Sequence, residues 1–166
     1  MDGEKIRFEG IMDVGPIVLS HTKNPAQEEA LMFLEKILKR KILCLTPVSI
    51  FLGAYIIMTR YLRVPKNDAS KALRRTLSLD LPIFYEDIPR HIAIESLEDA
   101  STYKISSWDA YIANLAKVNN IKIVYTIDIK DFERIPWLEP VSPVSIEKLV
   151  EYTQWIQKKG DNDSCI

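Results

Sequence analysis

Three aspartates occupy positions that would suit the binding of a divalent metal ion. Asp13 closes a predicted strand over residues 8–13, Asp109 lies in the first turn of a predicted helix, and Asp128 follows another predicted strand. In an open α/β sheet, ligands bind beyond the carboxyl ends of the strands, so acids at strand ends and helix starts can meet in one cleft. Carboxylates gathered in this way repel one another unless a divalent cation neutralises them. The first expectation is therefore a metal site.

Each of these aspartates also has a purely structural explanation. Ser106 and Asp109 have the spacing of a capping box, with aspartate in place of the usual Glu or Gln, and an acid in the first turn complements the helix dipole. Asp13 could simply end a strand, and Asp128 could cap a short helix. Asp131 is either a solvated helix residue or a cap, although it lies close enough to support the other acids. The metal interpretation depends on the three aspartates occurring together.

Strand and helix patterns alternate along the chain, which predicts an α/β fold: a three-layer α/β/α sandwich with a central parallel sheet. The segment 122–125 is apolar on both faces, as expected of a buried parallel strand. Proline within 81–85 favours an edge strand there. We expect strands at 8–13, 41–45, 81–85, 122–125 and 140–144, and helices beginning near 16, 25, 48, 67, 89, 107 and 145.

Several helix starts are predicted from capping residues and proline. Asn24 is the expected N-cap of a helix with Pro25 in its first position. Thr46-Pro47 repeats this pattern before a helix from Val48 to about Leu62. Pro16 is expected in the first position of a short helix, and Ser145 is expected to cap a C-terminal helix over about 145–158.

The composition of the chain fits one compact domain spanning residues 1–166, with a polar tail at 160–166. The chain has 166 residues and is 47% hydrophobic, enough for a sizeable core. The N-terminus is charged, and the apolar run 42–61 is interrupted by polar residues, proline and glycine, so we expect no membrane span and a soluble, cytoplasmic protein. Cys44 is expected in the core. A bond between it and Cys165 stays open, although a cytoplasmic setting disfavours one.

Positive charge is concentrated in one part of the chain. Residues 36–75 carry ten Lys or Arg against one acid, Asp68, so this segment is +9 and the remainder is −10, which gives the net charge of −1. A basic region beside an acidic cluster suits a phosphodiester substrate held near a metal. The alternative is that these are solvated helix faces. Arg40, Arg60 and Arg63 are the candidate substrate-binding residues.

Three short segments carry a family resemblance: 11–17 (IMDVGPI), 106–113 (SSWDAYIA) and 124–132 (VYTIDIKDF). In this order and spacing they resemble the PIN-domain family, and most of all its small prokaryotic members, the VapC-like toxins of toxin–antitoxin pairs. The resemblance spans roughly residues 8–144. The family implies an α/β/α sandwich and a Mg²⁺- or Mn²⁺-dependent ribonuclease acting on RNA. It also implies frequent homodimers and an antitoxin protein as a partner.

By position, Asp13, Asp109 and Asp128 match the family's catalytic, metal-binding aspartates, and Thr126 matches a position where a hydroxyl often lines the site. The family's remaining acid is usually a glutamate on the helix after the second strand. Gly53 occupies that position here, and a shifted alignment does not supply an acid because residues 36–67 contain no Asp or Glu.

The missing glutamate divides two hypotheses. Mg²⁺ can be held by one or two carboxylates, waters and substrate phosphate, so three aspartates suffice for one ion, whereas a second ion is doubtful. The leading hypothesis is an endoribonuclease in which one metal polarises the phosphate and an aspartate positions the attacking water. The rival is a PIN-like module that binds RNA or assembles without cleaving.

The two histidines, His21 and His91, lack the spacing of zinc ligands, so we expect them in surface or core packing. We also expect packing roles for Trp108, Trp137 and Trp155.

Overall fold

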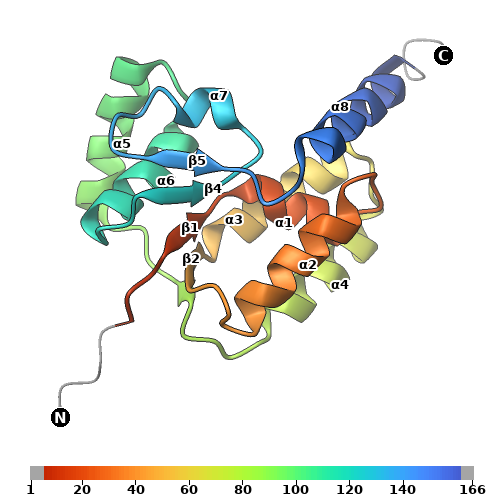
Figure 1. Ribbon diagram of the computed structural model, residues 1–166, viewed down its shortest axis with the longest axis horizontal. Helices are drawn as coiled ribbons and strands as arrows, with labels where there is room; N and C mark the ends of the chain where they lie inside the picture. The colour runs from red at the N-terminus through yellow and green to blue at the C-terminus, as the bar shows by residue number, and fades with distance from the viewer. Residues whose placement is uncertain (1–5, 162–166) are drawn as a thin grey trace.

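The centre of the protein is a five-stranded parallel sheet, seen in a computed structural model that describes residues 6–161 (Figure 1). The strand order is β3-β2-β1-β4-β5, and every neighbouring pair is parallel. The predicted edge strand within 81–85 is confirmed at one border of the sheet. The strands are β1 (Gly10–Met12), β2 (Cys44–Pro47), β3 (Phe84–Tyr85), β4 (Ile123–Tyr125) and β5 (Glu139–Val141).

Helices cover both faces of this sheet, which confirms the predicted three-layer fold. Parallel strands need long crossover connections, and helical crossovers lie over the sheet faces. Figure 1 shows α5 and α6 on one side of the sheet and α1 to α4 on the other. The helices are α1 (Val14–His21), α2 (Gln27–Leu38), α3 (Ser49–Ile56), the π-helix η1 (Ile57–Tyr61), α4 (Lys66–Leu77), α5 (Arg90–Tyr103), α6 (Ser107–Val118), α7 (Ile129–Phe132) and α8 (Ile146–Asp161).

The order of the strands creates a point where the chain changes direction. From β1 the chain adds β2 and then β3 toward one border, and it then returns to place β4 on the other side of β1. The backbone N–H of Asp13 donates to the carbonyl oxygen of Tyr125 at 3.0 Å, which ties the ends of β1 and β4 together. Ligands of open α/β sheets bind at such a switch point, beyond the carboxyl ends of the strands.

The hydrophobic core joins all three layers. The two central strands β1 and β2 are buried along their whole length, as expected of parallel strands covered on both faces. The thiol of Cys44 is free and buried, as predicted, whereas Cys165 lies outside the described residues. Large fully buried side chains come from every layer and include Ile11, Phe51, Ile112 and Phe132.

Three predicted helix starts differ from the observed ones by one or two residues, and the capping roles predicted for Thr46 and Asn24 were wrong because these residues have other partners. Thr46 and Pro47 belong to β2, where they pair with β3, so α3 begins later, at Ser49. The side chain of Asn24 accepts a hydrogen bond from the N–H of Ala26 at 2.9 Å and closes a turn, so α2 begins only at Gln27. The helix near Pro16 begins two residues earlier than predicted, at Val14.

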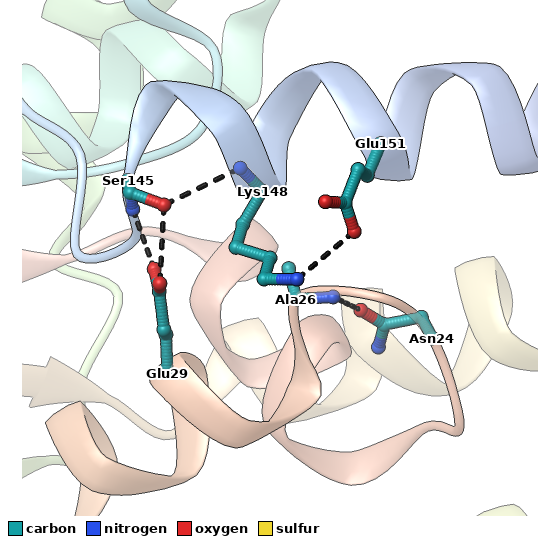
Figure 2. A network of polar contacts seen from close by, with 6 residues as sticks. All are labelled: Asn24, Ala26, Glu29, Ser145, Lys148 and Glu151. Atoms are coloured by element: carbon teal, nitrogen blue, oxygen red, sulfur yellow. Dashed lines mark hydrogen bonds and ion pairs between the residues drawn. The ribbon is translucent and has the colours of Figure 1, made fainter.

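The last helix, α8, lies at the periphery of the molecule (Figure 1). Hydrogen bonds join the start of α8 to α2 (Figure 2). Ser145 caps it as predicted, because its hydroxyl accepts the N–H of Lys148 at 3.3 Å. The carboxylate of Glu29 in turn accepts the N–H and the hydroxyl of Ser145, at 2.6 and 3.1 Å. A small second cluster packs beneath α8 and includes Leu19, Ala26, Ala30, Val144 and Tyr152.

The last helix continues to Asp161, which includes the first residues of the predicted tail at 160–166. The rest of that tail lies outside the described residues. Among the described helices, none combines the length and the hydrophobicity needed to cross a membrane.

Candidate active site

Asp13 is a buried carboxylate at the switch point of the sheet. It follows β1 directly, and only 3% of its surface is exposed. Its Oδ2 accepts a hydrogen bond from the hydroxyl of Thr126 at 2.7 Å, whereas its Oδ1 is buried without a donor. Burial raises the pKa of this carboxyl, the neighbouring charge of Asp128 acts in the same direction, and the hydrogen bond from Thr126 opposes both. One oxygen of Asp13 is therefore available to a cation.

Thr126 connects two of the aspartates. It is fully buried just after β4, and it donates to Asp13 while its oxygen accepts the backbone N–H of Asp128 at 3.0 Å. A hydroxyl can fill both roles at once because it is both a donor and an acceptor. The structure thus gives Thr126 a positioning role, in line with the hydroxyl expected beside this site.

Asp109, Asp128 and Asp131 form a cluster in which one carboxylate oxygen from each residue lies within 4.8 Å of the others. Asp109 reaches it because α6 leads into β4 and runs antiparallel to it, which places the start of α6 at the carboxyl edge of the sheet. Asp128 is the N-cap residue of α7 and Asp131 lies within its single turn, and residues three apart on a helix are neighbours. Asp131, expected only to support the other acids, is thus a full member of the cluster.

The electrostatics of the cluster show that its charges are poorly compensated. Burial raises the pKa of Asp109 to about 6, and the charges of Asp13, Asp128 and Asp131 act in the same direction. The pKa of Asp128 is also raised, chiefly by burial and then by Asp131. Among the ion pairs of the described residues, the only one that reaches this cluster joins Asp131 to Arg134 at 3.7 Å. A cation bound between these carboxylates would relieve the repulsion.

The donor set fits a small divalent ion. Mg²⁺ takes oxygen ligands in near-octahedral geometry, in which opposite oxygens lie roughly 4.2 Å apart. The three clustered oxygens of Asp109, Asp128 and Asp131 span little more than this distance. Asp13 does not belong to this group of three, but its charge raises the pKa of Asp109, so the two carboxylates interact. Hard oxygen donors of this kind favour Mg²⁺ or Mn²⁺ over softer metals.

Helix capping does not use up these carboxylates. Ser106 caps α6 through its hydroxyl, which accepts the backbone N–H of Asp109 at 3.0 Å, so the predicted cap and an available Asp109 carboxylate coexist. Asp13 and Asp128 occupy the N-cap positions of α1 and α7, but neither side chain makes a capping hydrogen bond of good geometry. The nearby backbone N–H groups of the two helix starts still lower the pKa of each carboxyl, although burial raises it more. The structural explanation therefore accounts for the position of these aspartates and leaves their carboxylates for another role.

Gly15 is a positioning residue that the sequence did not reveal. A Cβ atom at this position would lie 2.5 Å from Cγ1 of Ile127, far closer than side chains tolerate. The missing side chain lets the start of α1 approach the segment between β4 and α7, which holds Asp13 near Asp128. A glycine beside a turn has several explanations, so only this tertiary contact distinguishes close packing from backbone freedom.

Gly53, the position of the absent glutamate, lies on α3 and is half-buried. A Cβ atom added here would meet Val14, the residue after Asp13, at 3.4 Å, which is ordinary contact. A longer side chain at residue 53 therefore begins beside the start of α1, and the backbone leaves space for it. The contact with Val14 also agrees with the alternative that Gly53 favours close helix packing.

Of the three candidate substrate-binding arginines, Arg40 lies apart from Arg60 and Arg63. Arg40 follows α2 and precedes β2, which places it at the amino edge of the sheet, opposite the aspartates. The helix α2 runs antiparallel to the strands, and this direction carries its end away from the site. Arg60 and Arg63 are exposed at the far end of the α3–η1 segment from Ser49.

The two histidines also lie outside the acidic cluster. His21 is mostly buried and its ring contacts the hydroxyl of Thr76 at 2.8 Å, while His91 is exposed. Burial lowers the pKa of His21. The packing role predicted for His21 fits these contacts.

A model of the PIN domain matches residues 17–138, and the chain belongs to this family. The matched region includes Asp109, Asp128 and Asp131 and begins just after Asp13. The geometry described above is therefore what associates Asp13 with the other acids. No curated protein matches the chain.

Solved structures with the same fold include proteins of toxin–antitoxin systems. VapC20 from Mycobacterium tuberculosis, a sarcin-ricin loop cleaving toxin, is 15% identical, with a TM-score of 0.61 over 78% of this chain and 97% of its own. A chain of a toxin–antitoxin complex from Klebsiella pneumoniae is 22% identical, with a TM-score of 0.56 over 82% and 99%. FitAcB from Neisseria gonorrhoeae is 20% identical, with a TM-score of 0.52 over 81% and 97%. At these identities the likeness establishes the fold.

Proposed function

We propose that the protein is a metal-dependent endoribonuclease of the PIN type and the toxin of a toxin–antitoxin pair. The observation that carries this proposal is the convergence of Asp109, Asp128 and Asp131 within 4.8 Å at the switch point, together with Asp13, whose charge raises the pKa of Asp109. Such a concentration of uncompensated charge is costly for the fold. A bound metal ion would explain why these charges lie together. Phosphodiester hydrolysis is the reaction that both the PIN family and an acidic metal site support.

The residues of the chain have distinct tasks in this proposal. Asp13, Asp109 and Asp128 would hold one Mg²⁺ or Mn²⁺, and Asp131 would complete the shell directly or through water. When bound, the ion would supply Lewis-acid activation of the phosphate and of the attacking water. Thr126 would keep Asp13 in place through its hydrogen bond. A carboxylate oxygen not engaged by the ion would orient the water for in-line attack.

The rival function, RNA binding or assembly without cleavage, is favoured by Gly53, since the glutamate usual at this position is absent. Asp131 weakens that argument, because a fourth carboxylate is supplied from α7 instead of α3. Asp13 and the three clustered aspartates therefore give four acids at this edge of the sheet. This is the reason for placing catalysis ahead of the rival.

A cytoplasmic location, a homodimer and an antitoxin partner belong to the same proposal. They are supported by the family and by the toxin–antitoxin proteins among the solved structures of this fold. Exposed apolar side chains on α3, including Leu52 and Ile56, offer a surface to such a protein partner.

Cleavage of single-stranded RNA by the purified protein tests the proposal. We expect cleavage with Mn²⁺ or Mg²⁺, none with EDTA, and a loss of at least about a hundredfold in rate for Asp109→Asn or Asp128→Asn. The matched control is Asp68→Asn, which removes an exposed first-turn acid from α4 and leaves the cluster intact. RNA binding without metal binding or cleavage would establish the rival. Cleavage that survives both cluster substitutions would refute the assignment of the site.

A further inference from the structure

A hollow between α5 and α6 adjoins the first turn of α6, the turn that carries Asp109, and has no role in the function proposed so far. Its volume is about 190 Å³. None of its lining residues carries a charge, and two of them, Ser107 and Trp108, directly precede Asp109 in the chain. It is called the α5–α6 hollow below, and it is lined by Ile88, Ala93, Ser96, Leu97, Ser107, Trp108 and Tyr111.

One side of the hollow is aromatic. The rings of Trp108 and Tyr111 lie 5.6 Å apart at an angle of 44°, both on the first turns of α6. The hydroxyl of Tyr111 donates to the carbonyl oxygen of Asp87 at 3.1 Å, which fixes that ring. The opposite side is formed by small residues of α5, and Ile88 and Leu97 form an apolar rim that is 53% and 65% exposed.

Trp108 differs from the other two tryptophans in a way that packing does not explain. The indole N–H of Trp137 donates to the carbonyl oxygen of Ala113 at 3.1 Å, and Trp155 stacks on Tyr152. The indole N–H of Trp108 is buried and has no acceptor. Buried Trp N–H groups usually find a partner, so this donor, on a residue that lines the hollow, lacks the acceptor that a bound ligand would supply.

We propose that the α5–α6 hollow receives one unpaired nucleobase of the RNA, adjacent to the phosphate held at the aspartates. This inference rests on the proposed function, because that function supplies the RNA. Bases of single-stranded RNA bind proteins by stacking on aromatic rings, and their ring nitrogens and carbonyls are hydrogen-bond acceptors. The volume is below the roughly 300–1,000 Å³ of pockets that enclose drug-sized ligands, so it suits a single flat ring system.

The position and the charge of the site favour the same ligand. Successive residues of a helix project about 100° apart. Trp108 and Asp109 can therefore contact neighbouring groups of one substrate, a base and a phosphate, from the same helical turn. The aspartates repel a phosphate backbone until a cation binds. Affinity at this edge of the sheet must therefore come in part from contacts that do not depend on charge, and the uncharged hollow provides them.

The test compares RNA binding by variants of the hollow. The probe is a fluorescein-labelled single-stranded RNA of mixed sequence, and binding is followed by anisotropy without divalent ions, so that nothing is cleaved. We expect Trp108→Ala to weaken binding by roughly 5- to 150-fold, the range for loss of one base–aromatic stack, and Trp108→Phe to retain most of the affinity. The same RNA annealed to its complement should bind the wild type and Trp108→Ala equally, because a paired base cannot enter.

Two further variants keep the test decisive. Ala93→Leu fills the hollow from α5 without removing an aromatic ring, so it should weaken binding even if Trp108→Ala does not fold. Trp155→Ala removes a tryptophan that lies on α8, outside the hollow, and should leave RNA binding unchanged. Stabilisation by Mn²⁺, measured by thermal unfolding, should be the same in Ala93→Leu as in the wild type.

The outcomes separate this inference from the proposed function. If the wild type binds RNA and cleaves it with Mn²⁺, but Trp108→Ala and Ala93→Leu bind as tightly, the base pocket is refuted and the nuclease stands. If these variants instead lose a dimer seen by light scattering, and keep their RNA affinity, the hollow belongs to a contact between copies and the inference is likewise overturned. If the wild type neither binds nor cleaves RNA, the proposed function fails and the inference fails with it.

Discussion

Asp109→Asn should make the metal-free protein more stable at neutral pH. The pKa of Asp109 is raised from 3.8 to about 6 in the folded protein, so folding disfavours its charged form. The shift of about two units corresponds to about 3 kcal/mol, and solvent screening of this partly exposed group reduces it to about 1–2 kcal/mol. For a protein of this length, that gain corresponds to an increase of roughly 2–8 °C in Tm.

The sign of the pH dependence follows from the same shift. Because the folded pKa lies above the unfolded value, the wild type loses stability as pH rises from about 4 to about 6, and the loss then stays constant. Asp109→Asn lacks this contribution, so the two proteins should have nearly equal stability at pH 4 and differ most at pH 7. Urea unfolding with EDTA, followed by circular dichroism at several pH values, measures this difference.

Mn²⁺ should reverse the order of stability. The wild type gains free energy by binding the ion, whereas Asp109→Asn has lost one carboxylate and should gain less. Asp68→Asn is the control, because Asp68 is a first-turn acid of α4 and does not belong to the cluster. This variant should lose a few tenths of a kcal/mol of stability and be stabilised by Mn²⁺ as much as the wild type. If Asp109→Asn were less stable than the wild type at pH 7, or differed from it equally at pH 4, the carboxylates would not be sharing one electrostatic site.

Four further predictions follow from the geometry around the cluster. Gly53→Glu should increase Mn²⁺ affinity measured by calorimetry, with Gly53→Gln as the control; equal affinities would show that a carboxylate at this position does not reach the ion. Thr126→Val should lower the free energy of unfolding by about 1–3 kcal/mol and weaken Mn²⁺ binding, because Asp13 loses a donor and the N–H of Asp128 loses an acceptor. Thr126→Ser is the control and should keep both hydrogen bonds. Gly15→Ala should cost about 1–3 kcal/mol and reduce cleavage, since its Cβ displaces Ile127; unchanged activity would contradict the close approach. Burial lowers the pKa of His21, so its neutral form contributes stability above about pH 6.5, and this contribution is lost as pH falls below that value. In His21→Gln the free energy of unfolding should therefore depend less on pH in this range.

The elements of the fold were largely predictable because their signals are local. Alternating strand and helix patterns gave the layered α/β fold, and Ser106 and Ser145 marked helix starts that the structure has. Predictions failed where tertiary partners outweighed local signals. Thr46-Pro47 resembles a helix start, but hydrogen bonding with β3 makes it the end of a central strand.

The sequence by itself determined which acids follow which elements, since Asp13, Asp109 and Asp128 lie at strand ends and helix starts by virtue of their local context. Only the tertiary structure decided how these acids group. It placed Asp131 with Asp109 and Asp128, left one oxygen of Asp13 buried without a donor, and carried Arg40 to the opposite edge. The physical reason is that helix direction and strand order determine which ends share an edge. Contacts between distant residues, such as Gly15 with Ile127, then fix how closely those ends approach.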